Sequence, residues 1–378
     1  MDSQISPMGE RDFPDPVPGT TPVPERILQI DLLKAFAIFS VIIMHTFPIA
    51  AIIAVGGPYY LWNAVPLFIL IAGFTAAYGF RKRGATTLRQ CYDPGLVARR
   101  YVRLGAPYLL YWVLGVILLV TVLGVSLDAR GLVVNFASGG SGWGSYFIPI
   151  ILESVLVVPL LYVAALRHPD LMVVTALAVN IAFELLVVLT GSTAISSFIY
   201  FRYLFAGALG VWLVTTARRR RPAILLGGIA SLGYLTLVGY TTVFPQGSIF
   251  YQYDGALQFP AFLWTLVIAV AGLAWLPKAA TSRITRSLAA AGKASWHIFM
   301  VQMLFFLFPA EYVYGFLNTF FLRVVLEPVF FAFPQALDPA LQIVGVACNI
   351  AICCVLGYGW FSSEKRVAGA FRRRIHPA

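Results

Sequence analysis

The chain has 378 residues, of which 60% are hydrophobic and only 11% are charged. Soluble domains carry about 25% charged residues, so this composition excludes a soluble globular protein and predicts a chain that crosses a membrane several times. The formal net charge of +11 would suit a nucleic-acid-binding protein, but the placement of the basic residues explains it better, and we expect no nucleic-acid partner.

The N-terminal segment, residues 1–25, differs from the rest of the chain. It contains six prolines and several acidic residues, and it lacks the apolar core of a signal peptide. We therefore expect a disordered cytoplasmic tail.

Apolar runs of about 20 residues, the length that spans a bilayer, recur about ten times after this tail. They cover residues 27–50, 58–79, 104–126, 145–165, 171–190, 195–216, 223–243, 256–276, 294–316 and 340–361. The sequence thus predicts an all-α membrane bundle over residues 26–362, followed by a basic cytoplasmic tail over residues 363–378.

The basic residues indicate how this bundle is oriented. Of the 27 Lys and Arg residues, 23 fall on one side of the predicted scheme, in the two tails and in alternate loops. By the positive-inside rule that side is cytoplasmic, so both termini are predicted to lie in the cytoplasm. We expect an integral protein of the plasma membrane.

The first apolar run carries three ionisable residues, Asp31, Lys34 and His45. Such residues are rare in membranes because Lys or Asp at the centre of a helix costs about 2.5–3.5 kcal/mol. Lys34 and His45 lie within about 20° of the same helix face and about 16 Å apart, with the cation near the cytoplasm and the imidazole in the outer half. Asp31 is about 21 Å from His45 and cannot orient it, so its predicted partners are Lys34 or an arginine of the basic loops.

Several stretches, in order, resemble the acyltransferase 3 family of membrane acyltransferases. "RILQIDLLKAFAIFSVIIMH" (26–45) is similar to the family's opening, with Lys34 and His45 as its Arg/Lys-x10-His motif. "VPLFILIAGF" (65–74) resembles the second span, with Ala72 where serine is usual, and "RRYVRLGAPYLLYW" (99–112) supplies the Arg-x-x-Arg pair as Arg100 and Arg103.

Three later stretches continue the resemblance: "GSYFIPIILESVLVVPLLY" (144–162), "FRYLFAGALGVW" (201–212) and "GKASWHIFMVQMLFF" (292–306). One departure is Gln302, which stands where the family commonly has a second histidine. We therefore interpret Gln302 as structural or acceptor-facing.

The resemblance implies transfer of an acyl group, usually acetyl, from acyl-CoA to a hydroxyl of a glycan, glycolipid or hydrophobic small molecule. Acyl-CoA would be a co-substrate, with no tightly bound cofactor, and we assign no residue to a metal. Arg100 and Arg103 are the predicted phosphate ligands, joined by Arg81; the other interpretation of these arginines is membrane orientation and binding of anionic lipid. His45 is the predicted general base, and an acyl-histidine intermediate is the alternative chemistry.

Further charged residues fall in the middle or outer half of later spans, namely Glu153, Glu184 and Arg202. Glu153 is our first choice for a catalytic carboxylate beside His45, and Arg202 is grouped with the donor-binding residues. The other interpretation is a structural salt bridge between Arg202 and either Glu153 or Glu184.

The stretch "GGSGWG" (139–144) is predicted to be a flexible outer loop. The competing function is a transporter or flippase of an acyl or glycan precursor, since intramembrane charges suit that class too. Transporters often contain symmetry-related broken helices, and the sequence shows none.

Overall fold

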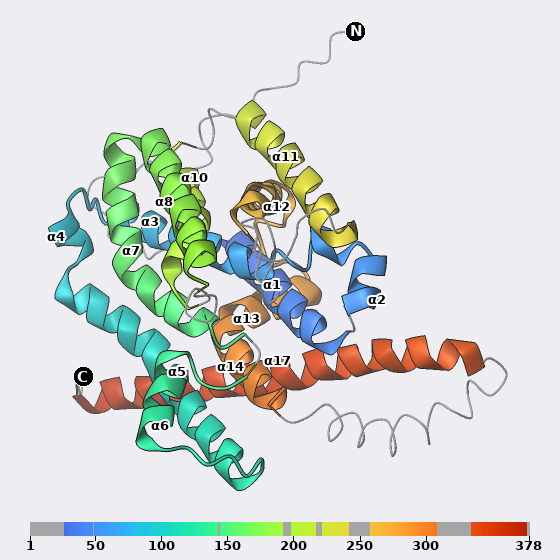
Figure 1. The fold of residues 1–378 in the computed structure, drawn as a ribbon. Helices are drawn as coiled ribbons and strands as arrows, with labels where there is room; N and C mark the ends of the chain where they lie inside the picture. The colour runs from blue at the N-terminus through green and yellow to red at the C-terminus, as the bar shows by residue number, and fades with distance from the viewer. Residues whose placement is uncertain are drawn as a thin grey trace.

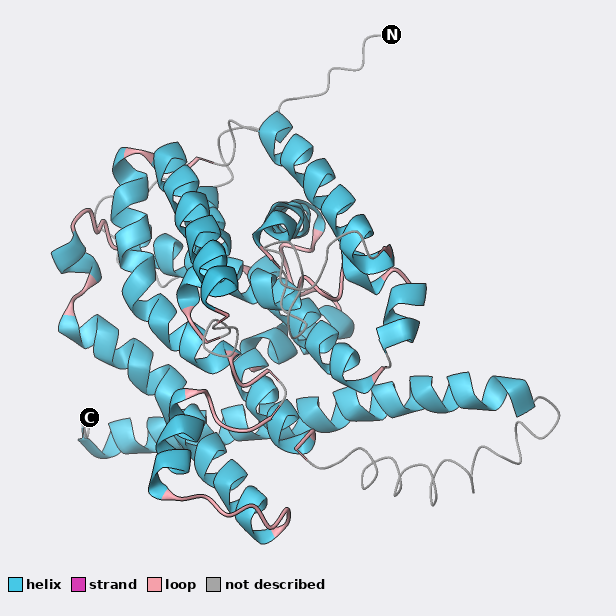
Figure 2. Ribbon diagram, in the orientation of Figure 1, coloured by secondary structure: helices cyan, strands magenta, loops and turns pink. Residues whose placement is uncertain are grey.

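A computed structural model describes residues 26–47, 49–142, 144–191, 198–216, 221–241, 258–307 and 334–375. These residues form helices joined by short loops and contain no strand, as predicted for an all-α protein (Figures 1 and 2). The predicted N-terminal tail, residues 1–25, lies outside the described residues, whereas the predicted C-terminal tail continues the last helix as far as Ile375.

The helices follow one another along the chain in the following order. The first half contains α1 (Leu28–Thr46), α2 (Ile49–Ala54), η2 (Gly57–Tyr59), α3 (Ala64–Lys82), α4 (Leu88–Cys91), α5 (Pro94–Thr121), α6 (Ala129–Ala137), α7 (Phe147–Arg167) and α8 (Pro169–Thr190). The second half contains η3 (Tyr200–Tyr203), α10 (Leu204–Thr215), α11 (Arg221–Tyr240), η5 (Phe259–Ala261), α12 (Phe262–Trp275), α13 (Arg283–Lys293), α14 (Ser295–Phe305) and α17 (Pro334–Ile375).

Seven helical stretches are long and apolar enough to cross a membrane, which makes this an integral membrane protein. They are Leu28–Thr46, Gly57–Lys82, Leu88–Thr121, Phe147–Arg167, Pro169–Thr190, Pro222–Tyr240 and Ile343–Val367. The other three predicted spans coincide with shorter apolar helical stretches, Tyr200–Thr215, Phe259–Trp275 and Ser295–Phe305. The number of crossings and the cytoplasmic position of both termini therefore stay predictions.

Helix α1 lies at the centre of the bundle, where α3, α12, α13, α14 and α17 contact it (Figure 1). Its residues Ala37, Ile38 and Ile42 are fully buried. A helix that is hydrophobic on all sides lies inside a protein or in a bilayer. The Lys34 and His45 face is thus held within the protein rather than turned to lipid.

Helices α3 and α10 approach each other closely because glycines line their contact. A Cβ placed on Gly73 would lie 2.4 Å from the carbonyl oxygen of Gly207, and one on Gly210 would lie 2.0 Å from the carbonyl oxygen of Leu70. No larger residue fits at such separations, and small residues are what bring membrane helices together. This contact fixes α3 against the core.

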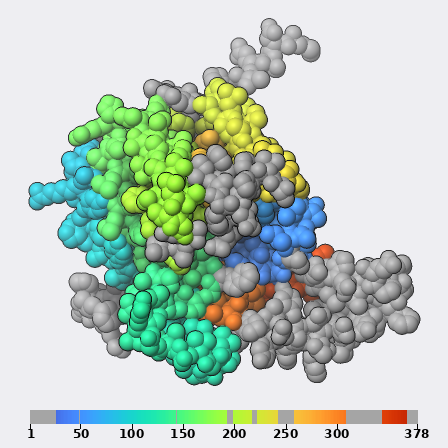
Figure 3. All heavy atoms as spheres, in the orientation of Figure 1, coloured from blue at the N-terminus to red at the C-terminus, as the bar shows by residue number. Residues whose placement is uncertain are grey.

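The outer helices carry the lipid-facing surface. Side chains of α5 such as Leu109, Leu110, Val113 and Ile117 are exposed, although all are apolar. Figure 3 shows α5, α7 and α8 forming one continuous flank of the molecule, in teal to green. An exposed apolar flank of this kind is what a bilayer covers.

Candidate functional site

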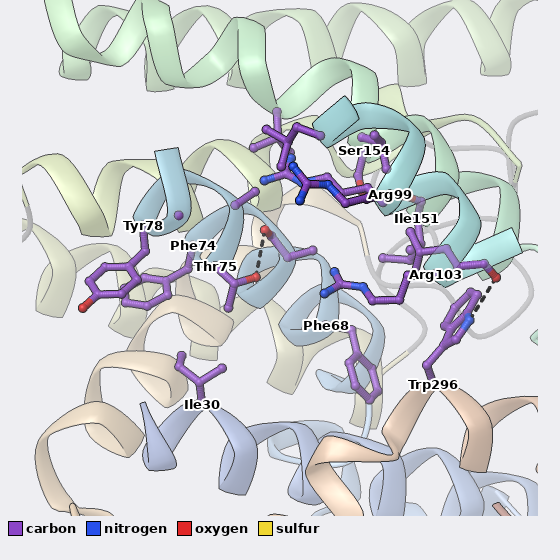
Figure 4. Close-up of a pocket in the computed structure, with 18 of the residues that line it drawn as sticks. Ile30, Phe68, Phe74, Thr75, Tyr78, Arg99, Arg103, Ile151, Ser154 and Trp296 are labelled. Carbon is purple, nitrogen blue, oxygen red and sulfur yellow. Dashed lines mark hydrogen bonds between the residues drawn. The ribbon is translucent and has the colours of Figure 1, made fainter. Parts of the chain in front are cut away.

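A cavity of about 1560 Å³ lies among α1, α3, α5, α7 and α14, and it also touches α17 at Glu364 (Figure 4). Two of these helices carry predicted site residues in the cavity: Asp31 and Lys34 lie on α1, and Arg100 and Arg103 lie on α5. In Figure 4, Arg99 and Arg103 enter the cavity from α5, Phe68 and Thr75 line it from α3, and Trp296 closes one side from α14.

The local sequence determines where α5, the helix that carries the cavity arginines, begins. Its first turn begins at Pro94, and the Asp93 side chain accepts a hydrogen bond of 2.8 Å from the backbone N–H of Leu96. Proline at the first helical position and aspartate at the N-cap both favour a helix start. The indole of Trp296 donates to the carbonyl oxygen of Leu104 at 3.2 Å, which ties α5 to α14 across the cavity.

The cavity is strongly basic. Its cationic lining residues are Arg26, Lys34, Lys82, Arg83, Arg99, Arg100 and Arg103. Arg26 pairs with Asp31 through two bonds of 2.6 and 2.9 Å, so the partner of Asp31 is a residue just before α1 rather than Lys34 or a loop arginine. Within the described part of the chain, the other six cations have no carboxylate in ion-pair contact.

Two of these cations share one aromatic ring. The guanidinium carbons of Arg83 and Arg100 lie 5.4 and 4.6 Å from the ring centroid of Phe80. Cation–π contact stabilises each arginine, but two like charges over one ring also repel each other. An anion with several negative oxygens relieves that repulsion, so this end of the cavity suits a phosphate-bearing ligand.

The opposite end of the cavity is aromatic. Phe147 packs against Phe68 and Phe299 at ring distances of 5.7 and 5.2 Å, and Trp296 stacks on Phe299 at 6.2 Å. All four rings line the cavity. The site therefore passes from a charged end to an apolar end.

His45 lies just beyond this apolar end. A Cβ placed on Gly144 would be 3.6 Å from the Phe299 ring and 3.8 Å from Nε2 of His45, so Gly144 lies beside both side chains. The His45 ring also lies 5.9 Å from that of Phe306. Phe299 thus borders the cavity on one side and the surroundings of His45 on the other.

Apart from His45, the predicted site residues fall into three places. Asp31, Lys34, Arg100 and Arg103 line the main cavity. Arg81 lies apart from them, because its guanidinium donates to the carbonyl oxygen of Val214 at 2.8 Å and lines a smaller pocket with Tyr162.

The third place is a buried polar cluster around α8 and η3. Glu153 accepts a 2.7 Å bond from the backbone N–H of Tyr200, and Arg202 lies 3.5 Å from Glu184. The salt bridge considered from the sequence thus joins Arg202 to Glu184. None of the three lines the main cavity in the part of the chain that the structure describes.

Arg202 and Glu184 are both almost completely buried, so we expect a large stability effect when one is removed. Arg202→Met should lower the free energy of unfolding by about 3–5 kcal/mol, because it leaves a buried carboxylate without its cation. The double variant Arg202→Met, Glu184→Leu should recover most of that loss. Thermal unfolding of both variants in detergent measures the effect, and a double variant no more stable than the single one would contradict it.

Sequence reasoning missed one side-chain pair at the cavity. His297 of α14 lies 2.6 Å from Glu364 of α17, and Glu364 lines the cavity. The two residues are 67 positions apart, so no local pattern signals the pair. Gln302, the departure from the family motif, is fully buried, and neither of its amide atoms has a hydrogen-bond partner among the described residues.

Comparison with known proteins gives one match. No curated protein and no solved structure matches the chain. A protein-family model described as an acyltransferase domain matches residues 27–358, which confirms the resemblance seen in the ordered motifs. The chain therefore belongs to the acyltransferase 3 family.

Proposed function

We propose that this protein transfers an acyl group, most simply acetyl, from acyl-CoA to a hydroxyl of a glycan, a glycolipid or a hydrophobic small molecule at the plasma membrane. The observation that carries the proposal is the cavity lined by six cations without carboxylate partners among the described residues. A donor with several phosphates and an apolar, uncharged arm matches its two ends.

The charged end would hold the phosphates. Arg83 and Arg100 over Phe80 offer paired guanidiniums, which bind phosphate oxygens in a bidentate way. Arg103 extends into the middle of the cavity (Figure 4). Lys34 lies on the α1 wall, about 16 Å below His45 by helical rise, where a thioester arm would pass.

The apolar end would deliver the thioester to His45. There the acceptor hydroxyl oxygen attacks the thioester carbonyl carbon while the His45 imidazole takes the hydroxyl proton. The tetrahedral intermediate then collapses, the carbon–sulfur bond breaks, and the thiolate of CoA receives the proton from His45. Direct transfer and transfer through an acyl-histidine both use these residues.

Loss of the cavity arginines should weaken donor binding. Arg100→Ala and Arg103→Ala should each raise the Kd for acyl-CoA by about tenfold to a hundredfold, because a hydrogen bond to a charged group contributes about 1.5–3 kcal/mol. Calorimetric titration with acyl-CoA and with a donor lacking the terminal phosphates measures the loss, which should shrink for the truncated donor. Arg167→Ala, an exposed cation outside the cavity, is the control. An unchanged affinity for acyl-CoA in both cavity variants would instead favour a role of these arginines in membrane orientation.

The function itself is tested with the purified protein in lipid nanodiscs. Acyl-CoA is supplied with candidate hydroxyl acceptors, and the release of free CoA thiol is followed together with formation of an ester. Mass spectrometry of envelope glycans and lipids from cells with and without the gene identifies the acceptor. Movement of a precursor without consumption of acyl-CoA would instead establish a transporter.

A further inference from the structure

The stretch predicted to be a flexible outer loop is folded against the core. We call residues 138–142 and 144–146, between α6 and α7, the glycine loop. Tyr108 and Tyr111 of α5 donate their hydroxyl protons to the carbonyl oxygens of Phe136 and Ser141. Trp112 of α5 also donates to Asn135 at 3.0 Å, and Asn135 donates to Ser141 at 2.6 Å, so these bonds tie the loop and the α6 turn before it to α5.

Its glycines place bare backbone against neighbouring helices. Gly139, Gly140, Gly142 and Gly144 have φ values of +91°, +90°, +125° and +91°, which residues with a Cβ rarely adopt. A Cβ on Gly142 would lie 2.9 Å from the carbonyl oxygen of Met303, so the loop packs directly on α14. At Gly144 the same backbone reaches His45 and Phe299, as described above.

Two backbone donors of the loop are unused. The N–H groups of Gly139 and Gly140 donate to Phe136 and Asn135, but those of Gly142 and Gly144 donate to no acceptor among the described residues. Both glycines are half-buried. A backbone N–H group without a protein acceptor is free to donate to the oxygen of a ligand.

We propose that the glycine loop stabilises the oxyanion of the acyl-transfer reaction through the backbone N–H groups of Gly142 and Gly144. The proposal rests on the function proposed above. When the acceptor oxygen bonds to the thioester carbon, the carbonyl π electrons move to the carbonyl oxygen, which becomes the oxyanion and accepts these hydrogen bonds. Expulsion of the thiolate restores the carbonyl, and the proton taken by His45 ends on sulfur. Donors fixed before the reaction stabilise the developing charge most strongly.

The tyrosine hydroxyls that hold the loop give the first test. Tyr111→Phe keeps the ring but releases the carbonyl of Ser141, so the loop donors lose their fixed position. We expect kcat to fall by at least about tenfold, towards the roughly 10²–10³-fold effect of losing one oxyanion donor. The KM for acyl-CoA and the Kd of a non-transferable thioether analogue should not change, because the ground state does not use these donors.

Tyr92→Phe is the matched control, because the Tyr92 hydroxyl also donates to a carbonyl, that of Leu156 in α7, but Tyr92 lies before α5 begins and away from the loop. A second pair tests the loop if Tyr111→Phe does not fold. Gly144→Ala and Gly124→Ala both add a Cβ at positive φ, but only the first lies beside His45, since nothing is within 4 Å of a Cβ on Gly124.

Lower kcat in Tyr111→Phe or Gly144→Ala than in its control, with unchanged analogue binding, supports the proposal. Equal kcat within both pairs overturns it. Suppose that the wild type transfers acyl groups and that His45→Ala abolishes this activity. Equal kcat values within both pairs then overturn only the role proposed for the loop and leave the proposed function intact. If the wild type does not consume acyl-CoA, the proposed function and the loop role fall together.

Discussion

Replacement of His45 by alanine is expected to lower kcat of acyl transfer by about 10²–10⁴-fold, the usual contribution of a general base. His45 lies beyond the aromatic end of the cavity, beside Gly144, so its loss leaves the charged end unchanged. Membrane insertion should not suffer, because the variant removes a polar group from an apolar helix. Steady-state CoA release by purified protein measures the effect, with acyl-CoA affinity as the second readout.

His168→Ala is the matched control, since His168 is an exposed histidine between α7 and α8, far along the chain from α1. A His45→Ala protein with near wild-type turnover would remove His45 from the mechanism. In the wild type, a stoichiometric burst of CoA release without acceptor would favour the acyl-histidine intermediate over direct transfer.

Donor and acceptor are expected to reach the site from opposite faces of the membrane. The cations lie towards the predicted cytoplasmic end of α1, whereas His45 is in its last turn and lies against the loop between α6 and α7. In proteoliposomes of known orientation, acyl-CoA should be used only from the face bearing Lys365 and Arg366. A water-soluble acceptor should be used only from the other face. Activity is therefore expected only when the two substrates are supplied on these opposite faces.

This result depends on both compartments being separately accessible. Detergent permeabilisation should restore activity to the inactive arrangements, which controls for damaged protein. Full activity with both substrates confined to the cytoplasmic face would contradict the transmembrane route. His45 would then have to be reached from the inner cavity alone.

Hydropathy predicted the helices well because burial from water is what it reports. Every predicted span coincides with an apolar helical stretch, seven of them long enough to cross a bilayer. Hydropathy could not predict that the helical stretches beginning at Tyr200, Phe259 and Ser295 are short, because apolar residues outside a helix are equally hydrophobic. It also could not separate α1, enclosed by protein, from α5, which has an exposed apolar face, since both environments favour the same side chains.

The site was predictable only where its residues share one helix. The spacing of Lys34 and His45 along α1 required no tertiary information. The separation of Arg81 from Arg100 and the contact of His297 with Glu364 depend on how helices pack, whereas the local pair of Asp31 with Arg26 depends on how the chain enters α1. The contacts of the glycine loop were not predicted, because glycine permits both mobility and close backbone contact, and the tyrosines that bind the loop lie on a different helix.

The glycine contact between α3 and α10 has a consequence for turnover. Because α3 packs backbone to backbone on α10 at Gly73 and Gly210, its side of the cavity is held against the core. Helix α5 forms much of the other wall, faces outwards with apolar side chains, and contains Pro107 four residues after Arg103. Proline inside a helix weakens its hydrogen bonding and favours bending there. We therefore expect opening and closing for CoA exchange to occur by hinging of α5, on the microsecond to millisecond scale of such motions.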